Sequence, residues 1–97
     1  MLHHVVLVTL RADATDAEVD AVLEGFASLP PAIPEIRTYD VGREAGLSPN
    51  DFGIVLVATF DSVEDFSAYR EHPAHVSFRQ DLLVPVSTGI TSTQFRA

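Results

Sequence analysis

The stretch that decides how this chain is organised is Tyr69-Arg70-Glu71-His72-Pro73-Ala74-His75-Val76-Ser77-Phe78. Proline is favoured at the first position of a helix, because its missing N–H would have no partner there anyway. The stretch therefore predicts one helix that ends just before His72 and a second that begins at Pro73, with His72 as its N-cap. His75 then lies in the first turn, where burial and the helix dipole both disfavour the imidazolium and lower its pKa. We expect a neutral His75 that can act as a base, approached by Tyr69 across the break.

The residues on either side complete these two helices. Upstream, Asp61 or Ser62 is placed to cap the first helix. Downstream, the inner face of the second helix is expected to carry His75, Phe78 and Leu82.

A third helix is predicted near the N-terminus. Thr15 and Glu18 form a capping-box pattern at its start. Apolar residues follow at the spacing of a single helical stripe, which predicts that one face of this helix is buried. They are Val19, Val22, Leu23 and Phe26.

Four segments have the composition of β-strands. Residues 4–10 and 52–60 are apolar at nearly every position, which predicts strands that are buried on both faces. Residues 37–41 are more polar, as is typical of an edge strand, and residues 88–95 close the chain. The resulting order is βαββα(α)β, so we expect a ferredoxin-like α+β fold with a four-stranded antiparallel sheet.

The second face of this sheet has no helix to cover it. Helices pack on one face only in such a fold, yet residues 5–8 and 52–60 offer apolar side chains to both faces. The same face of another copy would provide the missing cover. We therefore expect a homodimer formed through the open sheet face.

The composition limits the classes of function. The 97 residues are enough for one domain, residues 1–97, with a net charge of −8. The six basic residues are scattered arginines, which argues against nucleic acid or an anionic membrane as a partner. The N-terminal apolar run is too short for a signal peptide or a membrane span. No cysteine is present, so thiolate chemistry is excluded and a cytoplasmic location is expected. No cofactor motif such as a glycine-rich phosphate loop occurs, and we expect no cofactor.

Several short motifs cover nearly the whole chain in a recognisable order. The most specific is Tyr69-x-x-His72-Pro73-x-His75-x-x-Phe78. The others are His4-Val5-Val6-Leu7, Ile33-Pro34-Glu35-Ile36, Val41-Gly42, Phe60-Asp61-Ser62 and Val84-Pro85. Together they resemble the stress-responsive α/β-barrel (Dabb) family. The resemblance implies a ferredoxin-like domain whose four-stranded sheets pair into a dimeric α/β barrel.

The resemblance says less about activity. Many members of the family have no assigned reaction, but one plant member is a polyketide cyclase that closes a linear polyketide by an intramolecular aldol condensation. Its functional tyrosine and histidine match Tyr69 and His75, and a pocket histidine matches His4. Another of its pocket histidines falls at Ile54, where this chain departs from the enzyme.

These observations lead to a hypothesis for the site. The expected ligand is a small molecule in a pocket between sheet and helices, lined by His4, Tyr69, His72, His75 and Phe78. His75 and Tyr69 are the candidate catalytic residues of a cyclase-like lyase that acts on polyketide or similar carbonyl compounds. His75 would abstract a proton α to a carbonyl, and Tyr69 would steer it or stabilise the enolate.

Three alternatives stay open. The chain could be a non-enzymatic, stress-related dimer with a structural or interaction role. It could be a cofactor-independent monooxygenase, although such enzymes often use tryptophan or asparagine, and this chain has no tryptophan and one asparagine, Asn50. A metal site of His4, His72 and His75 lacks an obvious fourth ligand, so no metal is predicted.

Overall fold

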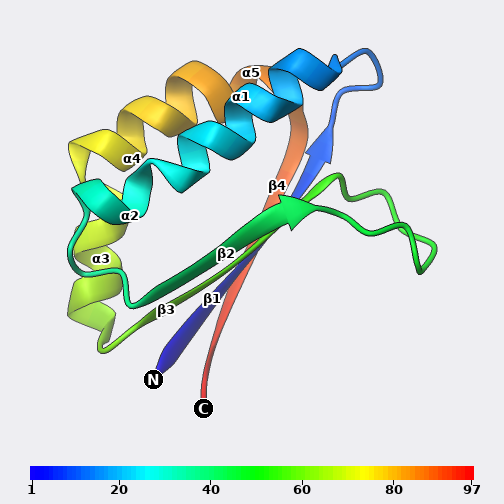
Figure 1. Ribbon diagram of the computed structural model, residues 1–97. Coiled ribbons are helices and arrows are strands. Elements are labelled where there is room, and N and C mark those ends of the chain that lie inside the picture. Colours follow the sequence, from blue (N-terminus) through cyan, green and yellow to red (C-terminus); the bar gives the residue numbers. More distant parts are fainter.

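The strands form a single antiparallel sheet of four, in the order β2-β3-β1-β4 (Figure 1). The computed structural model describes residues 1–97. The strands are β1 (Leu2–Leu10), β2 (Thr38–Arg43), β3 (Ile54–Phe60) and β4 (Ser87–Arg96). All three pairs of neighbours are antiparallel, and the polar strand β2 lies at an edge as its composition predicted. The ferredoxin-like α+β fold expected from the sequence is confirmed.

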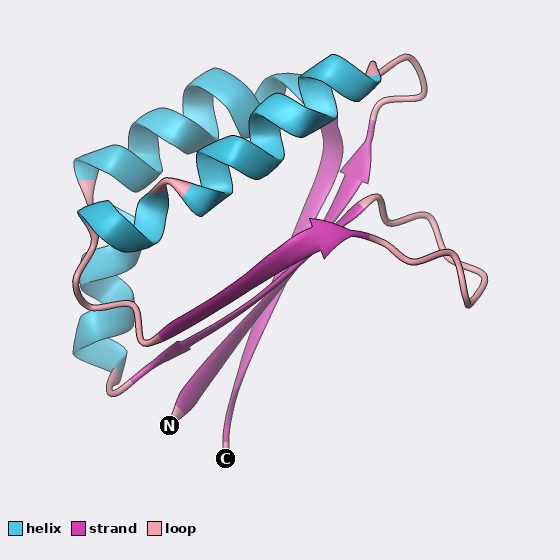
Figure 2. Ribbon diagram, viewed as in Figure 1, coloured by secondary structure: helices cyan, strands magenta, loops and turns pink.

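The helices cover one face of the sheet and leave the other bare (Figure 2). They are α1 (Asp16–Ala27), α2 (Leu29–Ala32), α3 (Val63–Glu71), α4 (Pro73–Phe78), the π-helical turn η1 (Arg79–Leu83) and α5 (Val84–Val86). None of them has the length and apolar character needed to cross a lipid bilayer. The cytoplasmic location stays a prediction of the sequence.

The helix starts follow the predicted caps. The Thr15 hydroxyl accepts the Glu18 N–H at 3.1 Å while the Glu18 carboxylate accepts the Thr15 N–H at 3.0 Å, which completes the capping box of α1. Ser62, rather than Asp61, caps α3 by accepting the Asp65 N–H at 3.1 Å. At α4, His72 accepts the Ala74 N–H on its Nδ1 at 3.1 Å, as expected of an N-cap.

The inner face of the last helical segment differs from the expected one by one residue. Leu82 is 38% exposed and Leu83 only 3% exposed, so Leu83 takes the core position that the sequence pattern gave to Leu82. The reason is the π-helical turn, in which the Val84 N–H bonds to the Arg79 carbonyl five residues back. The wider turn rotates the following residues, and a regular helical spacing no longer applies.

The core lies between the helices and one face of the sheet. On β3 the residues at alternate positions are fully buried. Of the predicted stripe of α1, Val19, Val22 and Phe26 are buried and Leu23 is half-buried. The helices approach closely at Gly25 of α1, where an added Cβ would overlap the ring of Phe78 from α4. This close approach fixes the position of α4 relative to α1, and with it the position of His75.

The opposite face of the sheet carries apolar side chains that no helix covers. The four at its centre are only partly buried, although the strands that carry them are the most apolar in the chain. They are Val5, Leu7, Val55 and Val57, which pair across β1 and β3. Such a continuous apolar face on a small domain is typical of a surface that contacts another protein.

Candidate functional site

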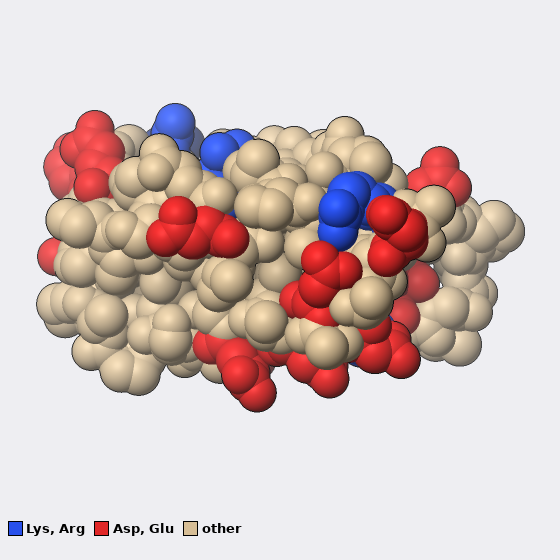
Figure 3. Space-filling model, turned by 90° about the horizontal axis from the view of Figure 1, so that it is seen from above, with Lys and Arg blue, Asp and Glu red and all other residues tan.

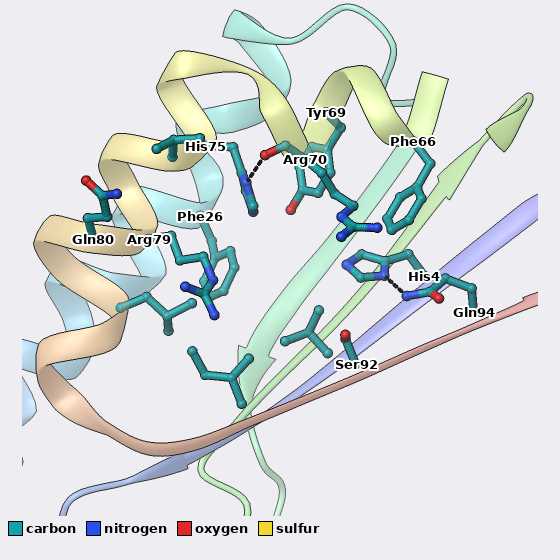
Figure 4. Close-up of a pocket in the computed structure, with 14 residues that line it drawn as sticks. His4, Phe26, Phe66, Tyr69, Arg70, His75, Arg79, Gln80, Ser92 and Gln94 are labelled. Atoms are coloured by element: carbon teal, nitrogen blue, oxygen red, sulfur yellow. Dashed lines mark hydrogen bonds between the residues drawn. The ribbon is translucent and has the colours of Figure 1, made fainter. Parts of the chain in front are cut away.

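A cavity of about 490 Å³ lies between the helices and the β1–β4 half of the sheet (Figure 4). Its walls come from β1, β4, α1, α3, α4 and η1. The lining residues are His4, Val6, Phe26, Phe66, Tyr69, Arg70, His75, Val76, Arg79, Gln80, Leu83, Ile90, Ser92 and Gln94. Half of these residues are hydrophobic and half are polar or charged, and the cavity has the size of a site for a small molecule.

The register of the sheet aligns the floor of this region. Tyr39 on β2 lies opposite Ala58 on β3, Ala58 lies opposite His4 on β1, and His4 lies opposite Gln94 on β4. All four residues therefore form one row across the helix-facing side of the sheet. Ala58 stands between Tyr39 and His4 in this row. Because its side chain is only a methyl group, the Tyr69 ring has room to pack over it, between the rings of Tyr39 and His4. The Tyr69 ring centroid lies 6.1 Å from that of Tyr39 and 6.0 Å from that of His4.

His75 is held as a neutral base that faces the cavity. Its Nδ1 lies 3.1 Å from the Arg70 carbonyl oxygen at the end of α3, so Nδ1–H donates and Nε2 keeps its lone pair. Figure 4 shows the second ring nitrogen directed away from this bond and into the cavity. Burial lowers the pKa of His75, and the Arg79, Arg70 and His72 side chains lower it further, although the bond to the Arg70 carbonyl opposes them.

His4 is also neutral, and more deeply buried. Burial lowers its pKa to about 4, and its neighbours His75 and Arg70 add to that shift. Its Nδ1 lies 3.0 Å from the side-chain nitrogen of Gln94, which donates, so the His4 proton resides on Nε2. His4 thus offers the cavity a hydrogen-bond donor rather than a base.

The Tyr69 hydroxyl is bonded to a second tyrosine. Tyr69 and Tyr39 are joined through their hydroxyl oxygens at 2.8 Å, and Tyr69 is 1% exposed. Burial raises the pKa of Tyr69 to about 12, opposed by the bond from Tyr39, whose own pKa burial also raises. Both phenols therefore stay protonated at neutral pH. The Tyr69 and His75 rings are 4.5 Å apart between centroids and make no hydrogen bond to each other.

The residues that the sequence assigned to a pocket fall into two groups. His4, Tyr69 and His75 line the same cavity. His72 and Phe78 do not line it, because His72 uses its ring to cap α4 and Phe78 packs against Phe26 with ring centroids 4.6 Å apart. Sequence spacing could not show which of these residues face the cavity and which face the core, because α4 is only six residues long.

The structure also shows where the three candidate metal-binding histidines and Ile54 of β3 lie. No three histidine, cysteine or carboxylate side chains lie close enough together to bind a metal ion, so the histidine trio considered from the sequence does not gather. Ile54, which the resemblance placed at a pocket position, is completely buried and is not part of the cavity lining.

Sequence reasoning missed Tyr39, Gln94 and Arg70. Strand alternation could have placed Tyr39 on the same face as Val41, but its bond to Tyr69 depends on how α3 packs. Gln94 needed the register between β1 and β4, two strands more than 80 residues apart in sequence.

The two histidines should make the fold less stable in acid. NMR titration of the imidazole protons should give His4 and His75 pKa values below the 6.5 of a free histidine. Between that value and about 4 the unfolded chain takes up protons that the folded chain does not, so the free energy of unfolding should fall as the pH is lowered through this range. The variant His4→Gln, which has no titrating ring at this position, should show a shallower fall in chemical denaturation. A pKa of His4 or His75 above 6.5 would contradict the described burial.

The bond between the two tyrosines can be measured by a double-mutant cycle. Either Tyr39→Phe or Tyr69→Phe leaves one buried hydroxyl without its partner and should lower the free energy of unfolding by about 1 kcal/mol. The double variant should cost less than the sum of the two, because no orphaned hydroxyl remains. Urea denaturation of the four proteins gives the coupling; strictly additive losses would mean that the hydroxyls do not interact.

Comparison with known proteins agrees with this architecture. Two plant proteins are similar in sequence, the stress-response A/B barrel domain-containing protein HS1 of Arabidopsis thaliana and olivetolic acid cyclase of Cannabis sativa. Each is 26% identical over 77 residues, which cover 77% of this chain, 71% of HS1 and 76% of the cyclase. Among solved structures, a dimeric ferredoxin-like protein from Thermobifida fusca is similar with a TM-score of 0.89 and 28% identity, covering 99% of this chain and 90% of that chain.

The family assignment covers almost every residue. The pattern of the stress responsive A/B barrel domain matches residues 2–96, from the first residue of β1 to the last of β4. This agrees with the sequence motifs around Tyr69 and His75 and with the ferredoxin-like sheet. The chain belongs to the stress responsive A/B barrel domain (Dabb) family.

Proposed function

We propose that the cavity binds a small carbonyl compound and that His75 abstracts a proton from the carbon α to the carbonyl. The observation that carries this proposal is the state of His75, a neutral imidazole whose Nδ1–H is engaged by the Arg70 carbonyl and whose Nε2 faces the cavity. A base must be unprotonated at the working pH and must have a free lone pair, and the neutral His75 has one that faces the cavity.

Tyr69 is suited to stabilise the enolate that forms. Since burial keeps its hydroxyl protonated, Tyr69 can donate a hydrogen bond and does not compete with His75 as a base. When Tyr39 donates to the Tyr69 oxygen, the Tyr69 proton is free for the negative oxygen of the substrate. His4 can add a second hydrogen bond from its Nε2–H.

The reaction that follows is an aldol closure within one substrate molecule. The enolate carbon attacks a second carbonyl carbon, a C–C bond forms, and the alkoxide takes back the proton that His75 removed. No oxidant or cofactor enters this balance. The similarity to olivetolic acid cyclase supports a cyclase-like activity.

Proton abstraction can be tested without knowing the natural substrate. The probe is α-methyl benzoylacetone, a neutral diketone with one acidic C–H, whose exchange with D2O is followed by NMR. The protein should accelerate this exchange, and His75→Gln should reduce the acceleration about a hundredfold, because a positioned base typically contributes that much or more. As a matched control, His72→Asn removes a histidine that lies outside the cavity and keeps an N-cap at α4, so exchange should persist.

An absence of acceleration by the unaltered protein would overturn the enzymatic proposal. It would leave the non-enzymatic alternative, a stress-related dimer with a structural or interaction role. An equal loss of exchange rate in His75→Gln and His72→Asn would show that His75 affects the reaction only by stabilising the fold.

We also propose that two copies pair through the open face of the sheet. Support comes from Val5, Leu7, Val55 and Val57, which no helix covers, and from the dimeric relative of known structure. Light scattering after size exclusion at micromolar concentration should give about twice 10.5 kDa. Val57→Asp should dissociate or unfold the protein, because its carboxylate would be buried without a partner.

The control for this substitution is Val63→Asp. Val63 is 46% exposed on the helical side, and an acidic residue in the first turn of α3 suits the helix dipole, so this variant should remain dimeric. A monomer for the unaltered chain would refute the pairing.

A further inference from the structure

The arginines of this chain divide into those that pair with carboxylates and those that do not. Arg11 pairs with Glu18 at 3.0 Å, Arg37 with Asp61 at 3.3 Å, and Arg43 with Asp20 at 3.2 Å. Arg70, Arg79 and the near-terminal Arg96 form no ion pair, although the chain carries fourteen acidic residues and a net charge of −8. Of these three, Arg70 and Arg79 line the cavity.

The cavity itself contains no acidic group. Not one of its lining residues is Asp or Glu, while both histidines are neutral, so the two guanidinium groups are its only charges. Figure 3 shows the face formed by the helices, where acidic side chains are spread over the surface and the arginines form no continuous patch. A positive cavity in an acidic protein is thus a local arrangement and does not follow from the overall charge.

The two guanidinium groups reach the cavity from different elements. Arg70 lies in the last turn of α3, with its guanidinium carbon 5.4 Å from the centre of the Phe66 ring. Arg79 begins the π-helical turn η1. Figure 4 shows both side chains extended from the helices toward the sheet, with the Arg70 guanidinium near Phe66 and His4 and the Arg79 guanidinium on the other side of His75. Their positive charges also act on His75, since both disfavour its protonation.

We infer that the ligand of this cavity carries a carboxylate, which Arg70 and Arg79 bind while its carbonyl end lies at Tyr69 and His75. This inference rests on the proposed function and adds the substrate class, a keto acid rather than a neutral ketone. Guanidinium groups present paired donors that match the two oxygens of a carboxylate. Two cations suit a single carboxylate, whereas a polyphosphate chain would need more of them.

Binding of an acid should also change His75. A carboxylate between the arginines offsets the charges that now disfavour the imidazolium, so the pKa of His75 should rise on binding. A stronger base would result only when an acidic substrate is in place. This rise can be measured by NMR titration, separately from any turnover.

The test compares two derivatives of the diketone probe that differ only in charge, its para-carboxylate and its para-carboxamide. The carboxylate should bind on the order of tenfold more tightly in NMR titrations of the labelled protein, as expected for hydrogen bonds to a charged group. Arg70→Gln and Arg79→Gln should each reduce that preference, and high salt should weaken it. Both residues are exposed, so the variants should fold.

The control variant is Arg37→Gln, which removes the same charge at a site paired with Asp61 and outside the cavity. It should keep the tenfold preference. Equal affinities for carboxylate and carboxamide, or equal losses in all three variants, would overturn the inference.

The outcomes separate this inference from the proposed function. Exchange of the neutral diketone without any preference for the acid would overturn the inference and leave the proposed base in place. Preference for the acid without exchange of either probe would overturn the catalytic proposal. A rise in the His75 pKa on addition of the carboxylate, absent with the carboxamide, supports the inference in either case.

Discussion

The break between α3 and α4 at His72 and Pro73 determines the geometry of the whole site. In a continuous helix, Tyr69 and His75 would be rotated by about 240° from each other and would face different directions. Proline cannot supply the N–H that would continue α3, and the preceding residue is driven to an extended conformation, which His72 adopts with ψ 134°. The change of direction brings the rings of Tyr69 and His75 to 4.5 Å. It also frees the Arg70 carbonyl at the end of α3, which then holds the His75 ring.

Burial then decides what those side chains can do. His4, His75, Tyr39 and Tyr69 are all kept in their neutral forms by desolvation, so the site holds one free imidazole lone pair and several hydrogen-bond donors without a buried charge. This arrangement avoids the large cost of an unpaired ion in the interior. The positive charges stay on the exposed side chains of Arg70 and Arg79, where water solvates them.

The sheet connects this site to the open apolar face. The same strand β1 carries His4 toward the helices and Val5 away from them, as successive residues of a strand must. Since Val5 pairs with Val57 on β3, the uncovered face lies directly behind the row that holds Tyr39, His4 and Gln94. A partner on that face would therefore stiffen the floor of the cavity without entering it.

The sequence by itself determined the fold and part of the site. Hydrophobic alternation, capping residues and Pro73 are local signals, and local signals were enough for the order of elements, the edge position of β2 and the N-cap at His72. They also indicated that Tyr69 and His75 approach each other, because only a few residues separate them.

What the tertiary structure alone decided are contacts between distant segments. The bond from Tyr39 to Tyr69 depends on the packing of α3 over Ala58, and the bond from Gln94 to His4 depends on the register between the first and last strands. Leu83 rather than Leu82 is buried because of a π-helical turn, which the regular period of an α-helix does not describe. Likewise, the charge of the cavity follows from which arginines find carboxylates in space, and composition contains no information about pairing.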